Sequence, residues 1–218
     1  NSPNNPSGVI YPASAFAEIE AVLQRADHPI VLISDEPYKA LVFDGVVPPE
    51  VPPLVTRSIV ATSWSKSLAL PGERIGYLAF SPRMAEAAEL FEACTFTSRV
   101  LGFVNAPALW QWVVADVGDL AIDPAPYREK RDLMYEGLTR IGYQCVKPQG
   151  AFYVFPRTPI DDDVAFVRML ADESVLTVPG SGCGMPGHMR ISLTVERETV
   201  VRALPGFERA YRRARGEA

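Results

Sequence analysis

A lysine, two serines and an arginine lie close together in the sequence between residues 63 and 77. Their side chains could form a covalent bond to a ligand and bind an anion. Lys66 follows Ser63 and Ser65, and Arg74 comes eight residues after the lysine. The lysine amine can form a Schiff base with an aldehyde. The two hydroxyls and the guanidinium can bind a phosphate. For Lys66 alone, a surface lysine at the start of a helix is the alternative, because short motifs often match by chance.

This set of groups is what an enzyme dependent on pyridoxal phosphate (PLP) needs in one place. PLP supplies the electron sink, and the protein supplies the amine, the phosphate contacts and the electrostatics around the ring. The hypothesis therefore depends on the elements that must position these residues.

Two short runs in the first half of the chain are predicted to be parallel strands of one sheet. Residues 30–34 and 58–62 are mostly apolar, which is typical of strands buried on both faces of a parallel sheet. Asp35 ends the first run, and Lys66 lies just beyond the second. Open α/β sheets bind ligands outside the carboxyl ends of their strands. We therefore expect Asp35 and Lys66 to face the same crevice.

A third run, residues 75–80, is predicted to be antiparallel to the second. It begins only about a dozen residues after the second run ends, which is too short a connection for a parallel crossover with its helix. A strand that turns back begins at the edge where its predecessor ended. Arg74 is therefore expected at the edge that carries Lys66.

The rest of the chain is predicted to alternate helices with short strands. Apolar periodicity indicates helices over residues 12–26, 82–94, 104–117, 124–141, 162–173 and 196–213. Short strands are expected over residues 144–146, 151–155, 175–178 and 189–194. An α+β pattern away from a parallel sheet suggests a second, smaller domain. We expect an α/β protein with a large-domain part over residues 1–125 and a small C-terminal domain over residues 126–218.

Composition and charge limit the function classes. The 218 residues are 48% hydrophobic and 22% charged, with a net charge of −5, which argues against a nucleic-acid surface. The three cysteines are widely spaced, which favours a reducing cytoplasm over a disulfide framework. Both histidines lack neighbours at metal-ligand spacing, so no metal site is expected. No apolar run reaches the roughly 18 residues of a membrane helix, so no membrane partner is expected.

The chain resembles the class I/II aminotransferases of PLP fold type I, similar to aspartate aminotransferase. The resemblance covers essentially the whole chain and rests on motifs that occur in the family's order. These motifs are Asn5-Pro6-Ser7-Gly8, Asp35-x-x-Tyr38, Ser63-x-Ser65-Lys66, Arg74-x-Gly76, Gly150-Ala151-Phe152-Tyr153 and Met189-Arg190-Ile191-Ser192. The resemblance implies part of a PLP fold type I large domain, whose mostly parallel sheet has one antiparallel strand, plus a smaller α+β domain.

The resemblance implies a catalytic role for three of these residues. Lys66 would form the internal aldimine with PLP and act as the general base. Asp35 would pair with the pyridine nitrogen and keep the ring protonated. Tyr38 would hydrogen-bond the cofactor's 3′-oxygen, and Asn5 would contact the same oxygen and the substrate. Taken singly, Asp35 could merely end a strand and Asn5 could be a turn residue.

The remaining site residues are implied for binding. Ser63, Ser65 and Arg74 would bind the cofactor phosphate, with a bidentate grip from the arginine. The Ser65 hydroxyl could instead cap the following helix. Arg190 would hold the α-carboxylate of the substrate, and its alternative is a strand-edge arginine facing water. No role is assigned to the motif from Gly150 to Tyr153.

The expected reaction is amino-group transfer between an L-amino acid, aspartate or a similar donor, and a 2-oxo acid. One alternative keeps PLP but is a C–S lyase or an amino-acid-phosphate aminotransferase, because these enzymes share most of the residues. Another is the aminotransferase-like effector domain of a transcription regulator, although such regulators usually vary the motif intact at Asn4 to Gly8.

The chain is expected to be the C-terminal part of a longer protein. It begins without methionine in the turn-rich segment from Asn1 to Gly8. The resemblance implies that an N-terminal half supplies a second phosphate-binding loop and a residue from a neighbouring subunit. We therefore expect a cytoplasmic homodimer at full length, and an isolated chain that is inactive.

Overall fold

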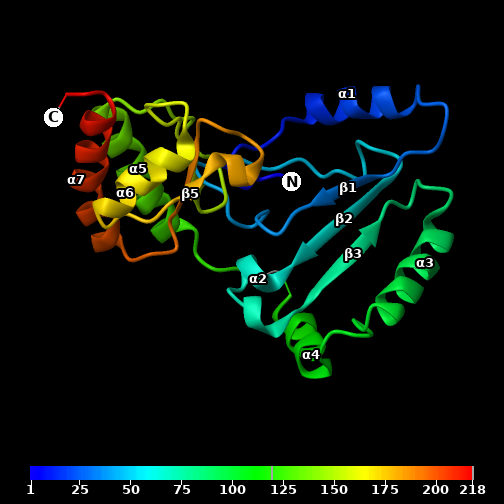
Figure 1. Cartoon of the computed structure of the whole chain (residues 1–218). Coiled ribbons are helices and arrows are strands. Elements are labelled where there is room, and N and C mark those ends of the chain that lie inside the picture. The colour runs from blue at the N-terminus through cyan, green and yellow to red at the C-terminus, as the bar shows by residue number, and fades with distance from the viewer. Residues whose placement is uncertain (119, 218) are drawn as a thin grey trace. The chain divides into compact units, whose positions relative to one another are not determined.

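The computed structural model describes residues 1–118 and 120–217, which form two compact units. The first unit contains Asn1–Pro3 and Ile10–Ile122. The second contains Asn4–Val9 and the residues from Asp123 onward. Each unit has its own sheet and its own helices (Figure 1).

The first unit is built on a three-stranded sheet in the order β1-β2-β3 (Figure 1). Strands β1 (Leu32–Asp35) and β2 (Ser58–Ser63) are parallel, and β3 (Gly76–Phe80) is antiparallel to β2. The prediction of an antiparallel third strand is therefore confirmed. The connection holds only the short helix α2 (Trp64–Ser67) and the 3-10 helix η1 (Pro71–Glu73), too little chain to return to the opposite edge.

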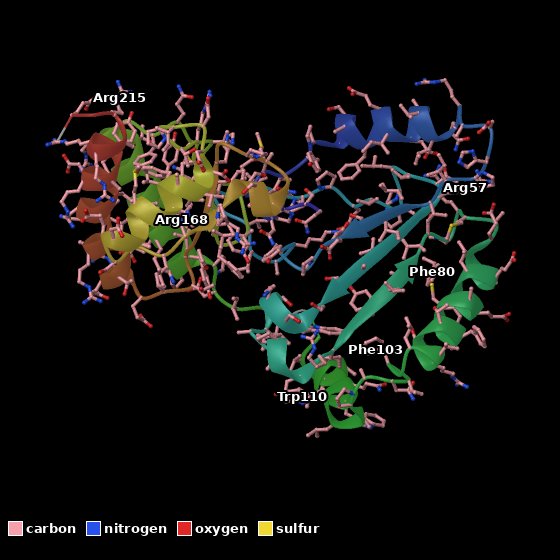
Figure 2. The ribbon with its side chains drawn as sticks, in the orientation of Figure 1. Arg57, Phe80, Phe103, Trp110, Arg168 and Arg215 are labelled. Carbon is pink, nitrogen blue, oxygen red and sulfur yellow. The ribbon has the colours of Figure 1, made fainter. Side chains whose placement is uncertain are left out.

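Three longer helices belong to this unit: α1 (Ala13–Leu23), α3 (Ala87–Val100) and α4 (Ala108–Val117). Helix α1 buries Phe16 in a small apolar cluster with Val51 and Val55. Side chains also connect α3 with the sheet. Phe80 of β3, labelled in Figure 2, contacts the Phe91 ring of α3 edge-on, with 5.9 Å between the ring centroids.

The expectation that the parallel strands are buried on both faces is wrong for β1, and the antiparallel strand β3 is exposed as well. Ile33 of β1 is 64% exposed, and Tyr77 of β3 is 51% exposed. Only the central strand has a buried run, from Ser58 to Val60. An apolar run shows that both faces of a strand suit burial, but burial also needs elements that cover those faces. The described residues of this chain do not supply them at Ile33 and Tyr77.

The second unit contains both helices and strands. Its antiparallel sheet has the order β4-β6-β5, and the 3-10 helix η2 (Gly180–Cys183) follows β5. The helices are α5 (Ala125–Ile141), α6 (Asp163–Asp172) and α7 (Arg197–Ala214), and the strands are β4 (Tyr153–Val154), β5 (Val178–Pro179) and β6 (Met189–Ser192).

The core of the second unit lies between its three helices. Leu138 of α5, Phe166 of α6 and Phe207 of α7 are fully buried or nearly so. The Tyr143 ring packs against Phe166 and Phe207, and its hydroxyl donates to the Phe207 carbonyl oxygen at 3.0 Å. Burial raises the pKa of this phenol far above its ordinary value. Tyr143 therefore acts as a neutral core residue.

The strands expected in this half need correction. Of residues 175–178, only Val178 lies in a strand, β5. Residues 144–146 also form no strand. The Gln144 carbonyl accepts a hydrogen bond from Arg157 N–H, and Val146 is exposed.

The segment Asn4–Val9 folds with the second unit, whereas a division at residue 125 assigns it to the first. The Gly8 carbonyl accepts hydrogen bonds from the N–H groups of Gln149 and Gly150, and a Cβ on Gly8 would lie 2.5 Å from Pro148. This close approach requires glycine.

A buried carboxylate anchors the connection between β5 and β6. Asp163, the first residue of α6, is 4% exposed and accepts a hydrogen bond from Ser181 N–H at 2.6 Å. This hydrogen bond holds the pKa of the Asp163 carboxyl below its ordinary value. The connection leads directly into β6, the strand that carries Arg190.

We expect Asp163→Asn to reduce the acid sensitivity of the second unit. Because the folded carboxyl has the lower pKa, the unfolded chain takes up the proton first as the pH falls below about 4. The stability that the ionised group contributes is present above that range and is lost below it. Denaturant unfolding at several pH values should show that wild type loses more stability between pH 5 and 3 than the variant. Asp161→Asn, at an exposed carboxylate, is the control, and equal acid sensitivity of wild type and Asp163→Asn would contradict the prediction.

Candidate active site

Five of the predicted site residues line one cavity of about 310 Å³ in the first unit. These residues are Asp35, Ser63, Ser65, Lys66 and Arg74. The sheet explains their convergence. Asp35 ends β1 and is paired with Ala61 of the parallel strand β2, so both strands run toward the cavity. Because β3 is antiparallel, its beginning lies at the same edge.

Arg74 reaches this edge in an unusual backbone conformation. Its φ is 53° and its ψ is 43°, in the left-handed region that a non-glycine residue adopts at a cost on the order of 1 kcal/mol. Its Nη1 donates to the Pro71 carbonyl at 2.7 Å. Two residues later, a Cβ on Gly76 would lie 2.5 Å from the Thr62 carbonyl oxygen. Glycine therefore lets β3 start in close contact with β2 and brings Arg74 to the cavity.

Lys66 and the two serines come from the end of β2 and from helix α2. Ser63 occupies the N-cap position with extended backbone, and its side chain makes no capping hydrogen bond. Ser65 lies within the helix, so the structure does not support the alternative that Ser65 caps it. Both serines line the cavity together with Lys66.

Tyr38 is not among the residues that line this cavity. It is 5% exposed and lies in the turn that follows β1, where its carbonyl accepts from Leu41 N–H at 2.8 Å. The structure thus brings together five of the predicted cofactor residues of the first unit and leaves the Tyr38 side chain outside their cavity.

The donor set of the cavity fits PLP. Arg74 and the two serines offer charge-assisted and neutral hydrogen bonds to a phosphate. Lys66 offers the amine for an aldehyde, and Asp35 offers an anion for a protonated ring nitrogen. No group of three or more His, Cys, Asp and Glu side chains at metal-binding distances is found in the described part of the chain.

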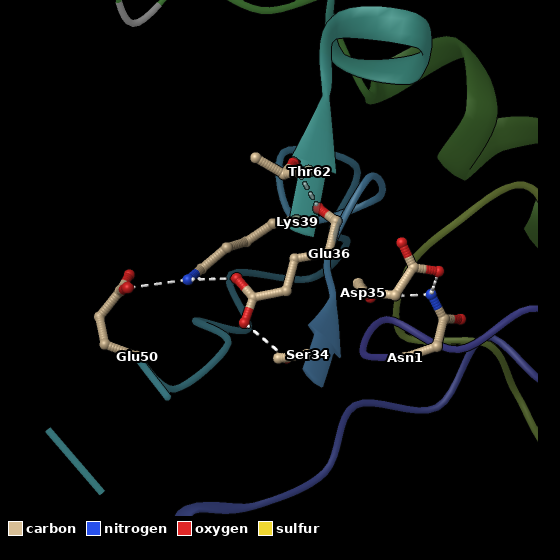
Figure 3. A network of polar contacts seen from close by, with 7 residues as sticks. All are labelled: Asn1, Ser34, Asp35, Glu36, Lys39, Glu50 and Thr62. Carbon is tan, nitrogen blue, oxygen red and sulfur yellow. Dashed lines mark hydrogen bonds and ion pairs between the residues drawn. The ribbon is translucent and has the colours of Figure 1, made fainter. Parts of the chain in front are cut away.

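Asn1 contacts the Asp35 carboxylate, a feature that the sequence did not predict. Its Nδ2 donates to Asp35 Oδ2 at 3.0 Å and to the Asp35 carbonyl oxygen at 2.9 Å (Figure 3). The only sequence signal is an asparagine in a turn-rich segment, which is too common to assign a partner.

A buried polar network lies next to Asp35. Glu36 is 3% exposed, and its carboxylate accepts from Ser34 Oγ and Lys39 Nζ, each at 2.8 Å (Figure 3). Lys39 Nζ also lies 2.8 Å from Glu50. Burial lowers the pKa of Lys39, but the two carboxylates outweigh it and raise the pKa above its ordinary value. The network holds the end of β1 in place.

The second unit brings Asn5 and Arg190 together. Arg190 Nη1 donates to Asn5 Oδ1 at 3.1 Å. The guanidinium carbon also lies 4.8 Å from the centre of the Tyr153 ring, where a cation is attracted to the face of the ring. Tyr153 thus supports Arg190, a role that the motif from Gly150 to Tyr153 did not reveal. Neighbouring strands explain the contact, because β4 pairs with β6.

A comparison with known protein families shows the family of this chain. Residues 1–206 match the family model described as aminotransferase class I and II. The chain belongs to this family. The resemblance that the order of the motifs suggested is therefore confirmed.

Aminotransferase relatives match over nearly the whole chain. It is 34% identical to the aspartate/prephenate aminotransferase of Thermus thermophilus over 98% of its length, and 30% identical to the aspartate aminotransferase of Thermotoga maritima over 95%. A crystal structure of an aminotransferase from Eubacterium rectale superposes with a TM-score of 0.95 at 43% identity and covers 98% of the chain. The fold is thus that of aspartate aminotransferase relatives.

The chain spans about half the length of these aminotransferases. It covers 56% of the Thermus thermophilus protein, 54% of the Thermotoga maritima protein and 55% of the Eubacterium rectale chain. Across the described residues, every helix is too short or too polar to cross a membrane.

Proposed function

We propose that the protein carrying this chain is a PLP-dependent aminotransferase that exchanges an amino group between an L-amino acid and a 2-oxo acid. One observation carries the proposal: Lys66, Arg74 and Asp35 line a single cavity at the edge of the sheet. The amine, the phosphate-binding cation and the carboxylate in one cavity match the aldehyde, the phosphate and the ring nitrogen of PLP. Membership of the aminotransferase family supports the same reaction.

Lys66 would bind the aldehyde of the cofactor and, once substrate has displaced it, move the proton that leaves the substrate's α-carbon. When bound, PLP supplies an electron-poor ring that stabilises the negative charge left on that carbon. Asp35 would hold the proton on the ring nitrogen, because an anion at this position favours the protonated ring. One residue thus moves the proton, and the other keeps the ring able to accept electrons.

Ser63, Ser65 and Arg74 would hold the phosphate. An arginine can donate two parallel hydrogen bonds to a phosphate, and the serine hydroxyls add neutral donors. For Tyr38 and Asn5 we keep the proposal that they hydrogen-bond the 3′-oxygen. Tyr38 does not line the described cavity.

Arg190 would bind the α-carboxylate of the substrate. Its contacts with Asn5 and the Tyr153 ring hold the guanidinium in the second unit, and its planar fork matches a carboxylate. We propose aspartate as the amino donor, supported by the names of several relatives. One relative at 30% identity is an aromatic-amino-acid aminotransferase of Thermococcus litoralis, so aromatic donors belong in the assay.

We also propose that the full-length protein is a homodimer. Large apolar side chains are exposed in and between α3 and α4, including Phe96, Phe103 and Trp112. Phe103, labelled in Figure 2, is 75% exposed. Large exposed apolar patches mark contact surfaces, here with a partner subunit or with the rest of the protein, because the chain covers 56% of the Thermus thermophilus relative.

Borohydride reduction tests the proposed function directly. Reduction of the PLP-loaded full-length protein fixes a pyridoxyl group on the lysine that carries the cofactor, and peptide mass spectrometry locates it. We expect the label on Lys66. The chain's other lysines, Lys39, Lys130 and Lys147, serve as internal controls. A label on one of them without a label on Lys66 would refute the assignment.

A further inference from the structure

We infer that Asn1 is a positioning residue that holds the Asp35 carboxylate for the ring nitrogen of the cofactor. The inference rests on the proposed function of Asp35. It goes beyond that function by assigning a role to a residue outside the motifs, thirty-four positions before Asp35 in the chain.

The geometry of the contact fixes the Asp35 side chain. One nitrogen, Asn1 Nδ2, donates to both the main-chain oxygen of Asp35 at 2.9 Å and its Oδ2 at 3.0 Å. A carboxamide nitrogen has two hydrogens, so it can make both bonds at once. The final torsion of an aspartate is otherwise broad. Because the same nitrogen is bonded to the main-chain oxygen and to Oδ2 of Asp35, the two bonds restrict that torsion and set the direction of Oδ1.

Both partners of this contact are themselves anchored. Ser2 is 7% exposed, and its Oγ accepts from Tyr11 N–H at 3.1 Å, which ties the segment of Asn1 to the first unit. On the other side, Glu36 N–H donates to the Ala61 carbonyl at 2.8 Å and continues the β1–β2 ladder past Asp35. With the backbones held on both sides, the Asp35 carboxylate is the movable part that Asn1 restrains.

The chemistry of the donor suits this role. A carboxamide is neutral, so it can orient the carboxylate without neutralising its charge. An arginine or lysine at the same place would compete with a protonated ring nitrogen for that charge. Asn1 can therefore orient the Asp35 carboxylate and leave its negative charge available to the ring nitrogen.

Two substitutions of Asn1 in the full-length protein separate hydrogen-bond donation from shape. Asn1→Ala removes the carboxamide. Asn1→Asp keeps its shape but removes the donor and places a second carboxylate against Asp35. Gln24→Ala is the matched control, because Gln24, the C-cap residue of helix α1, lies outside the cavity and its Nε2 donates to the Glu20 carboxylate at 2.9 Å.

The first measurement is the dissociation constant for PLP, which is determined by absorbance titration. We expect Asn1→Ala to bind PLP about tenfold more weakly than wild type, Asn1→Asp to bind more weakly still, and Gln24→Ala to bind as wild type does. If shape alone mattered, Asn1→Asp would lie closer to wild type than Asn1→Ala. That order, or unchanged binding in both variants, would overturn the inference.

The second measurement needs no cofactor. Crystal structures of the cofactor-free protein should show one Asp35 rotamer in wild type and a shifted or divided one in Asn1→Ala. A single unchanged rotamer in the variant would overturn the inference even if PLP binds. If wild type shows the restrained rotamer but does not bind PLP, the proposed function fails while the contact between Asn1 and Asp35 stands.

Discussion

Lys66→Ala in the full-length protein is expected to abolish covalent retention of PLP and to lower kcat for transamination by at least about 10⁴-fold. The substitution removes the amine that binds the cofactor's aldehyde. It also removes the group that moves the α-proton, and no other lysine lines the described cavity. Absorbance of the purified protein reports cofactor retention, and single-turnover kinetics with aspartate report the proton transfer.

The control for this experiment is Lys147→Ala. Lys147 forms a half-exposed ion pair with Asp132 in the second unit, and such pairs contribute only about 0–1 kcal/mol. Its removal should leave both cofactor retention and kcat unchanged. Arg74→Ala should give a third pattern, with weakened cofactor retention but an intact Lys66 amine. Retention of kcat within tenfold of wild type by Lys66→Ala would rule out Lys66 as the reacting amine.

Arg190→Lys is expected to lower kcat/KM for every amino donor by roughly 10- to 150-fold while leaving PLP binding nearly intact. Lysine keeps the positive charge, but it loses the planar fork and the contact of the guanidinium with the Tyr153 ring. A hydrogen bond to a charged group contributes on the order of 1.5–3 kcal/mol, which corresponds to that range. Steady-state kinetics with aspartate, an aromatic donor and an aliphatic donor measure the loss.

The pattern across donors decides what Arg190 binds. All amino acids share the α-carboxylate, so a residue that holds it must affect all donors by a similar factor. A loss confined to aspartate would instead indicate a contact with its side-chain carboxylate. Arg212→Lys is the matched control, because Arg212 pairs with Glu208 on the exposed face of α7, and it should leave kcat/KM unchanged for each donor.

Local signals in the sequence were sufficient for the first sheet and for most of its cavity. The apolar runs predict the strands, and the short connection between Ser63 and Gly76 requires β3 to be antiparallel. Once those directions are set, Asp35, Lys66 and Arg74 must lie at one edge. Their types and spacing indicate the chemistry. Their common position could be predicted because strand direction follows from the length of a connection, which can be counted in the sequence.

Contacts between distant segments were decided only by the tertiary structure. Asn1 meets Asp35, and Arg190 meets Asn5, across separations of 34 and 185 residues. The packing of Asn4–Val9 with the second unit and the support of Arg190 by the Tyr153 ring belong to the same class. Periodicity and motif spacing report the conformation of neighbouring residues. Which side chains meet across long separations depends instead on how whole elements pack, and the exposure of Ile33 and Tyr77 follows from the same packing.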